Sequence, residues 1–501
     1  MARKTAPDQY VLLPARGLRA KKQTSTPAVQ SFLQAAPDPG PSAQALDVGD
    51  GRRVRVRIVD SIGPGGAKLI EASPEDVLAI RSTQPGLRVV PVVYYTPAWA
   101  PRKEVTNRVR TFAQVPKSTI RVVSRKDGKP IRGAILVAFT DYASGTGAQA
   151  VTNAKGEAAL NLGGATELDR LYVYPVNAFW TLRRRRLDLG ETGAQVSLRP
   201  LDLAVPDGVR HYYGEAGDSV GEGVVVGIVD TGCGPHPDLV IAGGANTVEG
   251  EKLDDHGDNG LGHGTHVAGI VAARGTPPTG ARGVAPGVAL RSYRVFARNT
   301  GQASNFAIAK AIDTAVADGC HLINLSLGAT FADPAITAAV DEARDVGTLC
   351  IAATGNDGRQ PVRYPAANEL TVAVSALGRK GTFPTDSAEA EEVAPPAGTD
   401  SAEFIAAFSN IGPQVDATAP GVGIISTYLA DSYAEISGTS MAAPAVTGVA
   451  ARLLSGSEVL AMKKDAGRHE AMMKTVLSAA VSRGFGARLE GHGLPQAPAG
   501  I

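Results

Sequence analysis

The sequence predicts an α/β protein whose largest part, residues 206–501, is a mostly parallel sheet with helices on both faces. Beyond residue 206, continuous apolar runs, typical of buried parallel strands, alternate with helical patterns. The predicted strands are 223–229, 289–296, 321–327, 349–353 and 370–376, and the predicted helices are 263–273, 306–318 and 335–346. The unusual motifs follow these strands, at the carboxyl edge where such sheets bind ligands.

The N-terminal part is predicted to contain a small α+β unit. Residues 1–53 hold one strand candidate, Gln9–Pro14, and a linker-like stretch rich in Pro, Ala, Ser and Gln over 22–48. Residues 54–100 form the unit itself, and an N-cap serine followed by proline and two acids, at 73–76, predicts its helix at 77–82. Its predicted strands are 54–59, 67–72 and 87–95, with Gln9–Pro14 as an optional fourth.

Residues 117–202 are predicted to form a small antiparallel β-sandwich, because short strand patterns are separated by turn signals and no helical period competes. The predicted strands are 119–124, 131–139, 158–161, 171–177 and 195–199. The charge run Arg183–Arg186 is interpreted as a solvated strand edge, and the alternative is a processing or anion site.

Composition excludes several classes of function. The 501 residues carry 50 basic and 49 acidic side chains and are 44% hydrophobic, so neither nucleic acid nor a membrane surface is indicated as a partner. The amino terminus lacks a signal-peptide core, and Cys233, Cys320 and Cys350 form no metal-finger pattern. We therefore expect a cytoplasmic protein with free buried thiols, with non-classical export as the alternative.

Four polar residues fall where the sheet predicts a site. Asp230 ends one strand, His263 opens a helix between two glycines, and Asn356 follows another strand. Ser440, in a turn of small residues before an apolar helix, is a helix cap if taken alone. The sequence separations of 33, 93 and 84 residues exclude a local reason for their co-occurrence.

The motifs around these residues resemble those of the subtilisin-like serine proteases. They are Val-Val-Asp-Thr-Gly, Gly-His-Gly-Thr-His-Val-Ala-Gly and Gly-Thr-Ser-Met-Ala-Ala-Pro, in the Asp, His, Ser order of that family, and the resemblance extends over 206–498. It implies a subtilisin-like fold and an endopeptidase in which Asp230 orients the base His263, Ser440 is the nucleophile and the Asn356 amide stabilises the oxyanion. A catalytically silent binding protein and an acyl hydrolase or ligase are the rival readings.

The same resemblance implies substrate-binding segments. Ser326-Leu327-Gly328 and Ala353-Thr354-Gly355 match the segments that pair with extended substrate and wall the main specificity pocket. Arg363, at the pocket floor, is expected to select an acidic or polar side chain before the cleaved bond. The alternative is that Arg363 pairs with Asp357 or turns outward, which leaves an ordinary apolar preference.

Other features carry weaker expectations. His236, His266 and Cys233 are interpreted as packed structural residues. No metal or other cofactor is expected. Members of the family often bind calcium, and the acidic segment 253–259 is a candidate site for it. The other interpretation of this segment, which we favour, is a solvated loop. Residues 379–405 are expected to form a mobile surface insertion.

Residues 54–97 resemble the propeptide that folds and inhibits subtilases, and the sandwich resembles carboxypeptidase-regulatory modules. The chain is therefore expected to be made as an inhibited precursor whose partners are a protein or peptide substrate and its own N-terminal region. Because the sandwich intervenes before residue 206, simple self-cleavage at the catalytic junction is in doubt.

Overall fold

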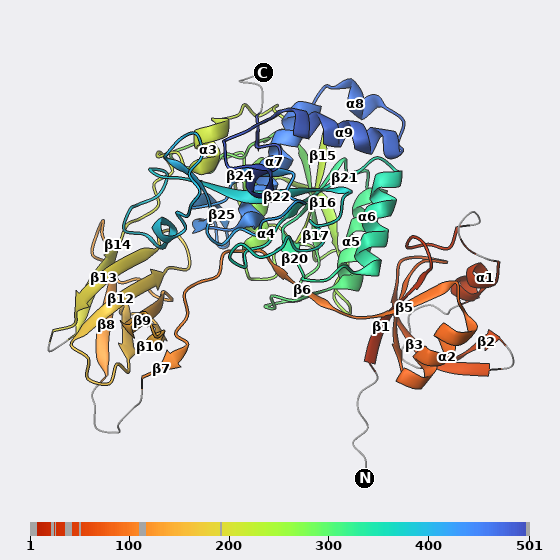
Figure 1. Ribbon diagram of the computed structural model, residues 1–501, viewed down its shortest axis with the longest axis horizontal. Coiled ribbons are helices and arrows are strands. Elements are labelled where there is room, and N and C mark those ends of the chain that lie inside the picture. Colours follow the sequence, from red (N-terminus) through yellow and green to blue (C-terminus); the bar gives the residue numbers. More distant parts are fainter. Residues whose placement is uncertain are drawn as a thin grey trace, which may run out of the picture.

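The protein was analysed as a computed structural model that describes residues 8–21, 25, 27–35, 43–49, 52–109, 117–190 and 193–496. Three parts follow one another along the chain. An N-terminal unit lies on one side of a central α/β part, and a β-rich part lies on the other (Figure 1).

The N-terminal unit is a five-stranded antiparallel sheet with two helices. The strand order is β2-β3-β4-β1-β5. The elements are β1 (Asp8–Pro14), α1 (Pro27–Ala35), β2 (Gln44–Gly49), β3 (Arg52–Ser61), β4 (Lys68–Ala72), α2 (Pro74–Thr83) and β5 (Leu87–Pro91). Helix α2 begins as its capping sequence predicts, because the Ser73 hydroxyl accepts a hydrogen bond from the Asp76 N–H at 3.1 Å.

The structure corrects the predicted boundary of this unit. The first strand, β1, lies inside the sheet between β4 and β5, and the stretch interpreted as a linker contains α1 and β2. The reason is that Val29 and Leu33, four residues apart on α1, are buried in one hydrophobic cluster with Leu12. The sequence did not indicate this pair, because residues 22–48 are rich in Pro, Ala, Ser and Gln. The unit therefore begins at Asp8 rather than at residue 54.

The chain then crosses the central part as an extended strand. Strand β6 (Tyr94–Pro97) lies between β18 (Ala303–Ser304) and β20 (Leu327–Gly328) and pairs with both in antiparallel register. In Figure 1 it passes beneath the central sheet on its way from the N-terminal unit to the β-rich part.

The β-rich part consists of two sheets, ordered β13-β12-β9-β10-β7 and β11-β8-β14, around a shared apolar core. The strands are β7 (Asn107–Arg108), β8 (Ser118–Ser124), β9 (Ile135–Asp141), β10 (Thr146–Val151), β11 (Glu157–Leu160), β12 (Glu167–Tyr174), β13 (Leu182–Asp188) and β14 (Ala194–Leu198). Strand β13 lies at a sheet edge with Arg184, Arg185 and Arg186 exposed, as expected for charges that discourage edge pairing. Sequence patterns missed β10.

The central sheet is parallel except at one end. Its order is β16-β17-β15-β19-β21-β22, with β24 pairing in parallel and β23 in antiparallel register with β22. The strands are β15 (Val225–Asp230), β16 (Ile241–Asn246), β17 (Ala289–Arg294), β19 (Leu322–Leu325), β21 (Leu349–Ala353), β22 (Thr371–Arg379), β23 (Glu403–Ile405) and β24 (Ala417–Pro420).

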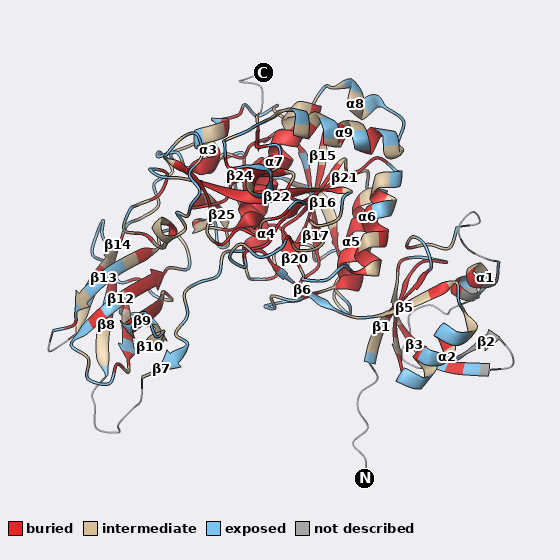
Figure 2. Ribbon diagram, in the orientation of Figure 1, coloured by how far each residue is buried: buried red, intermediate tan, exposed pale blue. Residues whose placement is uncertain are grey.

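Helices cover both faces of this sheet. Helices α4 (His263–Ala272) and α7 (Thr439–Leu454) share one hydrophobic core, and α5 (Asn305–Ala317) and α6 (Pro334–Asp345) share the other. Alternate residues of β15 divide between the cores, since Ile228 belongs to the first and Val229 to the second. Figure 2 shows the resulting buried centre.

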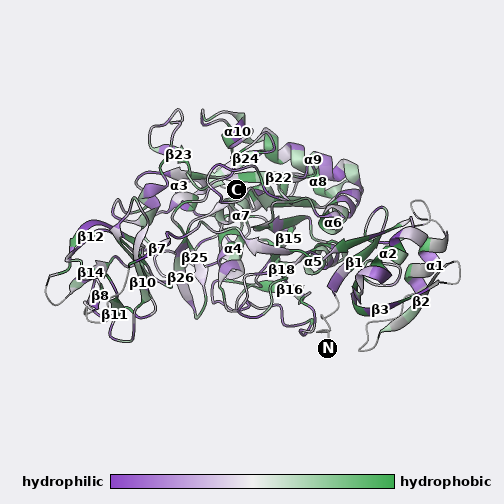
Figure 3. Ribbon diagram, turned by 60° about the horizontal axis from the view of Figure 1, so that its bottom comes forward, coloured by the Kyte–Doolittle hydropathy of each residue, from purple (hydrophilic) through white to green (hydrophobic). Residues whose placement is uncertain are grey.

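The remaining elements lie around this core. They are α3 (Gly208–Tyr213), the 3-10 helix η1 (Ala388–Glu391), β25 (Ile424–Tyr428), β26 (Ser432–Ile436), α8 (Glu458–Ala461), α9 (Ala466–Ser478), β27 (Ala480–Val481), α10 (Ala487–Glu490) and β28 (Leu494–Pro495). The outer helix α9 has both hydrophilic and hydrophobic residues (Figure 3). No helix in the described part of the chain is long and apolar enough to cross a membrane.

The insertion 379–405 differs from the mobile loop that the sequence suggested, because it carries hydrogen bonds to the β-rich part. Thr181 donates to the Glu389 carboxylate at 2.6 Å, and Arg170 forms an ion pair with Glu391 at 2.8 Å. The Arg183 N–H donates to the Asp386 carbonyl at 2.7 Å. The acidic composition that indicated mobility instead supplies acceptors for arginines of the neighbouring sheet.

Candidate active site

Asp230 and His263 meet in the buried centre. Asp230 ends β15, His263 is the first residue of α4, and both side chains are fully buried. The His263 Nδ1 atom lies 2.7 Å from Asp230 Oδ1, which also accepts the Thr231 N–H at 2.6 Å. The carboxylate thus fixes the ring orientation, and an Nδ1 proton shared with it leaves Nε2 as the basic nitrogen.

Close backbone packing explains the glycine on either side of His263. A Cβ on Gly264 would lie 2.2 Å from the Gly232 carbonyl, and Gly262 has φ of 77° with Tyr428 against it. A side chain at Gly264 would push α4 away from β15 and separate the imidazole from Asp230, and one at Gly262 would collide with the Tyr428 ring.

Ser440 lies in the first turn of α7, where a proline shapes its surroundings. Pro444 has no N–H to donate to the Ser440 carbonyl one turn earlier. The Ser326 hydroxyl takes that place, donating to the Ser440 carbonyl at 2.9 Å, and Asn324 donates to the same hydroxyl at 2.9 Å. A buried polar relay therefore replaces the missing helix bond and fixes the turn that bears Ser440.

Asn356 follows β21 and is held at the same place. Its Oδ1 accepts the Thr439 N–H and the Thr439 hydroxyl, both at 2.9 Å. These bonds determine which amide atom faces the site, because Oδ1 is occupied and Nδ2 is left to donate outward.

The outward donors converge on a carbonyl of the chain itself. Ala98, directly after β6, has its carbonyl oxygen bonded by the Ser440 N–H at 3.2 Å and by the Asn356 Nδ2 amide. The Ala98 N–H donates to the Ser326 carbonyl at 3.1 Å, and the Ala100 N–H donates to the Ser437 carbonyl at 2.7 Å. Residues 94–100 thus cross the site in an extended conformation, with the Ala98 carbonyl between the Ser440 and Asn356 donors.

The serine hydroxyl and the imidazole are not bonded to each other in this arrangement. Ser440 Oγ donates to the Ser326 carbonyl at 3.0 Å, and His263 Nε2 has no hydrogen-bond partner among the described residues. Trp99 covers the imidazole edge-on, with ring centroids 5.3 Å apart. For Nε2 to accept the hydroxyl proton, the Ser440 side chain must rotate away from the Ser326 carbonyl.

Leu327 and Gly328 form β20 and pair with Pro97 and Thr96, and a part of Ser326-Leu327-Gly328 in binding substrate stays a prediction. The segment Ala353-Thr354-Gly355 ends β21 and leads into Asn356. Tyr95, on β6, is fully buried in the hydrophobic cluster that contains Phe306 and Leu327. Sequence patterns missed the role of 94–100 because Tyr95 and its neighbours read as an ordinary strand.

Arg363 adopts the second of the two arrangements considered from the sequence. Its Nε donates to Asp357 at 2.6 Å, and its backbone N–H donates to the Thr354 carbonyl at 2.9 Å. A Cβ built on Gly328 or on Gly355 would lie 3.0–3.3 Å from the Arg363 stem, so this stem fills the space between the two walls. Its charge is paired with that of Asp357, and a part of Arg363 in substrate selection stays a prediction.

His236, His266 and the three cysteines are packed. Both backbone carbonyls of Ile424 and Ala434 lie within 3.2 Å of His266 Nε2, and burial lowers the pKa of His266 to about 3. His236 Nε2 contacts the Ser432 carbonyl at 3.1 Å. Cys233, Cys320 and Cys350 are buried free thiols, and burial raises the pKa of each.

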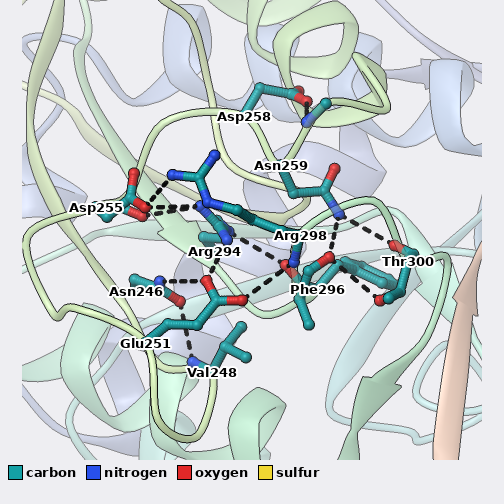
Figure 4. Close-up of polar contacts among 12 residues, drawn as sticks. Asn246, Val248, Glu251, Asp255, Asp258, Asn259, Arg294, Phe296, Arg298 and Thr300 are labelled. Atoms are coloured by element: carbon teal, nitrogen blue, oxygen red, sulfur yellow. Dashed lines mark hydrogen bonds and ion pairs between the residues drawn. The ribbon is translucent and has the colours of Figure 1, made fainter.

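The acidic segment 253–259 is bonded to arginines (Figure 4). The fully buried Arg294 pairs with Glu251 and, at 3.3 Å, with Asp255, while the exposed Arg298 reaches Asp255 at 2.6 Å. Asp258 accepts the Gly262 N–H at 2.8 Å at the start of α4. Among the described residues, no group of three or more His, Cys, Asp or Glu side chains is arranged to hold a metal ion.

The Ala98 carbonyl is surrounded by a carboxylate, an imidazole, a hydroxyl and two N–H donors. These are the groups of a serine hydrolase site. Comparison with known proteins specifies the class further. The sequence model of the Subtilase family matches residues 221–492, which is more than half of the chain, and the chain belongs to that family.

Characterised relatives agree with this assignment. The chain is 40% identical over 235 residues to a thermostable alkaline protease of Halalkalibacterium halodurans, which covers 47% of this chain and 58% of the relative. It is 38% identical over 240 residues to Subtilisin DY of Bacillus licheniformis, covering 47% of this chain and 78% of that protein. It is also 38% identical over 251 residues to Subtilisin Savinase of Lederbergia lenta, covering 50% of this chain and 83% of that protein. The chain thus spans about three-fifths of the first relative and about four-fifths of the other two.

The buried arginine gives a prediction about stability. Replacing Arg294 with Met leaves Glu251 and Asp255 without their buried partner, so the free energy of unfolding should fall by about 3 kcal/mol. The matched control Arg298→Met, which removes an exposed partner of Asp255, should cost less than about 1 kcal/mol. Both are measured by denaturant unfolding in a Ser440→Ala background, and equal losses would contradict the structural role of Arg294.

Proposed function

We propose that this chain is a serine endopeptidase made as an inhibited precursor, and that its first substrate is its own Ala98–Trp99 bond. The observation that carries the proposal is the Ala98 carbonyl bonded by Ser440 N–H and Asn356 Nδ2, directly after β6, the strand that pairs with β18 and β20. Two donors aimed at one carbonyl oxygen are what acyl transfer requires where negative charge develops.

The proposed reaction begins with rotation of the Ser440 hydroxyl from the Ser326 carbonyl toward His263. Oγ attacks the Ala98 carbonyl carbon as Nε2 takes its proton, and Asp230 stabilises the imidazolium. The oxyanion remains between its two donors until it collapses, when the proton passes from His263 to the departing Trp99 amine. Water then attacks the Ala98 ester on Ser440, and the carboxylate product leaves.

The N-terminal unit is proposed to act as an intramolecular inhibitor. It is attached to the catalytic part by ion pairs as well as by β6, since Lys310 reaches Asp60 at 2.7 Å and Arg19 donates to Asp313 at 2.7 Å. Cleavage after Ala98 would separate residues 1–98 from a product that keeps the β-rich part. The position of the sandwich therefore does not prevent self-cleavage, because the proposed bond precedes it.

The proposed reaction uses side chains of this chain alone and no cofactor. The support is the acidic segment itself, where the guanidinium groups of Arg294 and Arg298 pair with Asp255, a carboxylate that a calcium ion would need. Protein or peptide substrates are expected to bind as residues 94–100 do. Cytoplasmic residence stays a prediction.

Self-cleavage tests the proposal by intact mass. Wild-type chain should release a fragment ending at Ala98, and Ser440→Ala should remain whole because it lacks the nucleophile. Asn356→Leu should cut the same bond about 10²–10³-fold more slowly, because one oxyanion donor is lost. A fragment ending elsewhere, or equal cleavage in Ser440→Ala, would contradict the assignment.

We further propose that Arg363 makes the main specificity pocket shallow, so that a small residue such as Ala98 precedes the cleaved bond. In a peptide library, wild type should prefer Ala or Gly at this position, and Arg363→Ala should accept large apolar residues with a gain of about tenfold or more in kcat/KM, the range for filling a hydrophobic pocket. Arg359→Ala is the matched control, because this arginine donates to the Ile405 carbonyl at 2.7 Å instead. An acidic preference in wild type would favour the opposite interpretation of Arg363.

A further inference from the structure

A cavity lies beyond the Ala98–Trp99 bond, where three parts of the chain meet. Its volume is about 610 Å³, and residues 99–104 run along it. One wall comes from the β-rich part around Tyr174, and another from the insertion and β26. It therefore receives the residues that follow the scissile bond, on the side of the leaving amine.

Four carboxyl groups line this cavity, and the first of them, Glu104, belongs to the segment 99–104 itself. Glu389 and Glu392 come from the insertion, and Glu435 comes from β26. Glu389, only 5% exposed, accepts the Thr181 hydroxyl, Glu435 accepts the Ser437 hydroxyl at 3.1 Å, and Glu392 accepts the Phe408 N–H at 3.2 Å. These neutral donors do not balance the negative charge, which is costly in a partly enclosed space.

The chain itself places cations beside these groups. Arg102 and Lys103 are the fourth and fifth residues after the proposed scissile bond, and both line the cavity. The guanidinium carbon of Arg102 lies 5.6 Å from the centre of the Tyr174 ring, within the range of a cation–π contact. The Lys103 N–H donates to the Tyr174 hydroxyl at 3.0 Å, which fixes the backbone at this point.

The titration of the carboxyl groups supports this complementarity. Burial and the neighbouring charge of Glu389 raise the pKa of Glu435 well above its usual range, while Arg102 acts in the opposite direction. Burial also raises the pKa of Glu392, and Lys103 opposes that shift. A cation from a bound peptide therefore favours the ionised form of both carboxyl groups, against the effect of burial.

We propose that this cavity is a substrate subsite that selects basic residues at the fourth and fifth positions after the cleaved bond, with Tyr174 of the β-rich part as one wall. An organic cation suits this cavity better than a metal ion. Among the described residues, no set of three or more His, Cys, Asp or Glu side chains is arranged to hold a metal ion. The insertion and the β-rich part thereby gain a shared role in recognition. The proposal rests on the proposed endopeptidase function.

The first experiment measures binding without catalysis. In full-length Ser440→Ala, exchange of the Ala100 and Lys103 amide hydrogens reports whether residues 99–104 stay docked. Arg102→Gln with Lys103→Gln should accelerate this exchange about tenfold, the effect of losing about one favourable charge contact. The matched control Arg108→Gln, an exposed residue of β7 on the same linker, should leave it unchanged.

A second pair of changes locates the effect in the cavity. Glu389→Gln with Glu435→Gln keeps the shapes and acceptors but removes the charge. In that background, the Arg102 and Lys103 substitutions should produce no further acceleration. Unchanged exchange in the basic double variant, or an equal effect with and without the two glutamates, would overturn the proposal.

The second experiment measures selectivity on two peptides that differ only in carrying Arg-Lys or Gln-Gln at the fourth and fifth positions after Ala-Trp. Residues 99–104 compete equally with both peptides, so the ratio of kcat/KM isolates the subsite. The basic peptide should be favoured about tenfold by wild type and by the exposed control Glu458→Gln, but not by Glu389→Gln/Glu435→Gln. A ratio near one in wild type would overturn the proposal. Failure to cleave either peptide would instead contradict the proposed function. The amide-exchange experiment would then still test whether the cavity binds basic residues.

Discussion

The arrangement of the whole molecule depends on one carbonyl oxygen, that of Ala98, held between the Ser440 N–H and the Asn356 amide. For this contact, β6 must fit between β18 and β20, and Gly438 must lack a side chain, since a Cβ there would lie 2.7 Å from that oxygen. The N-terminal unit and the β-rich part then lie on opposite sides of the central part because the strand between them crosses it (Figure 1).

The Ser440 side chain is held in place by Ser326, because the Ser440 hydroxyl donates to the Ser326 carbonyl. Pro444 has a part in this arrangement, because its missing N–H leaves the Ser440 carbonyl to the Ser326 hydroxyl. The two residues thus exchange hydrogen bonds in both directions. In the function that we propose, this pair positions the nucleophile and holds it away from its base until the Ser440 side chain rotates.

The sequence predicted the central α/β part and the family well, because buried strands and small-residue motifs are local patterns with strict physical causes. Gly264 illustrates this, since only glycine fits against the Gly232 carbonyl. The boundary of the N-terminal unit was not predictable in the same way, because Val29 and Leu33 acquire their meaning only on packing against Leu12. The insertion was misjudged for a similar reason, since the arginines that bind its acids lie some 200 positions earlier in the chain.

Chemical labelling of Ser440 tests the central claim most directly. A fluorophosphonate needs the serine and the oxyanion donors free, so the uncleaved chain should resist labelling and the label should appear in step with release of residues 1–98. His211→Gln, away from the site on α3, should follow the same course as wild type. Equal labelling of the intact and the cleaved chain would show that Ala98 does not occupy the site in solution and would contradict the account.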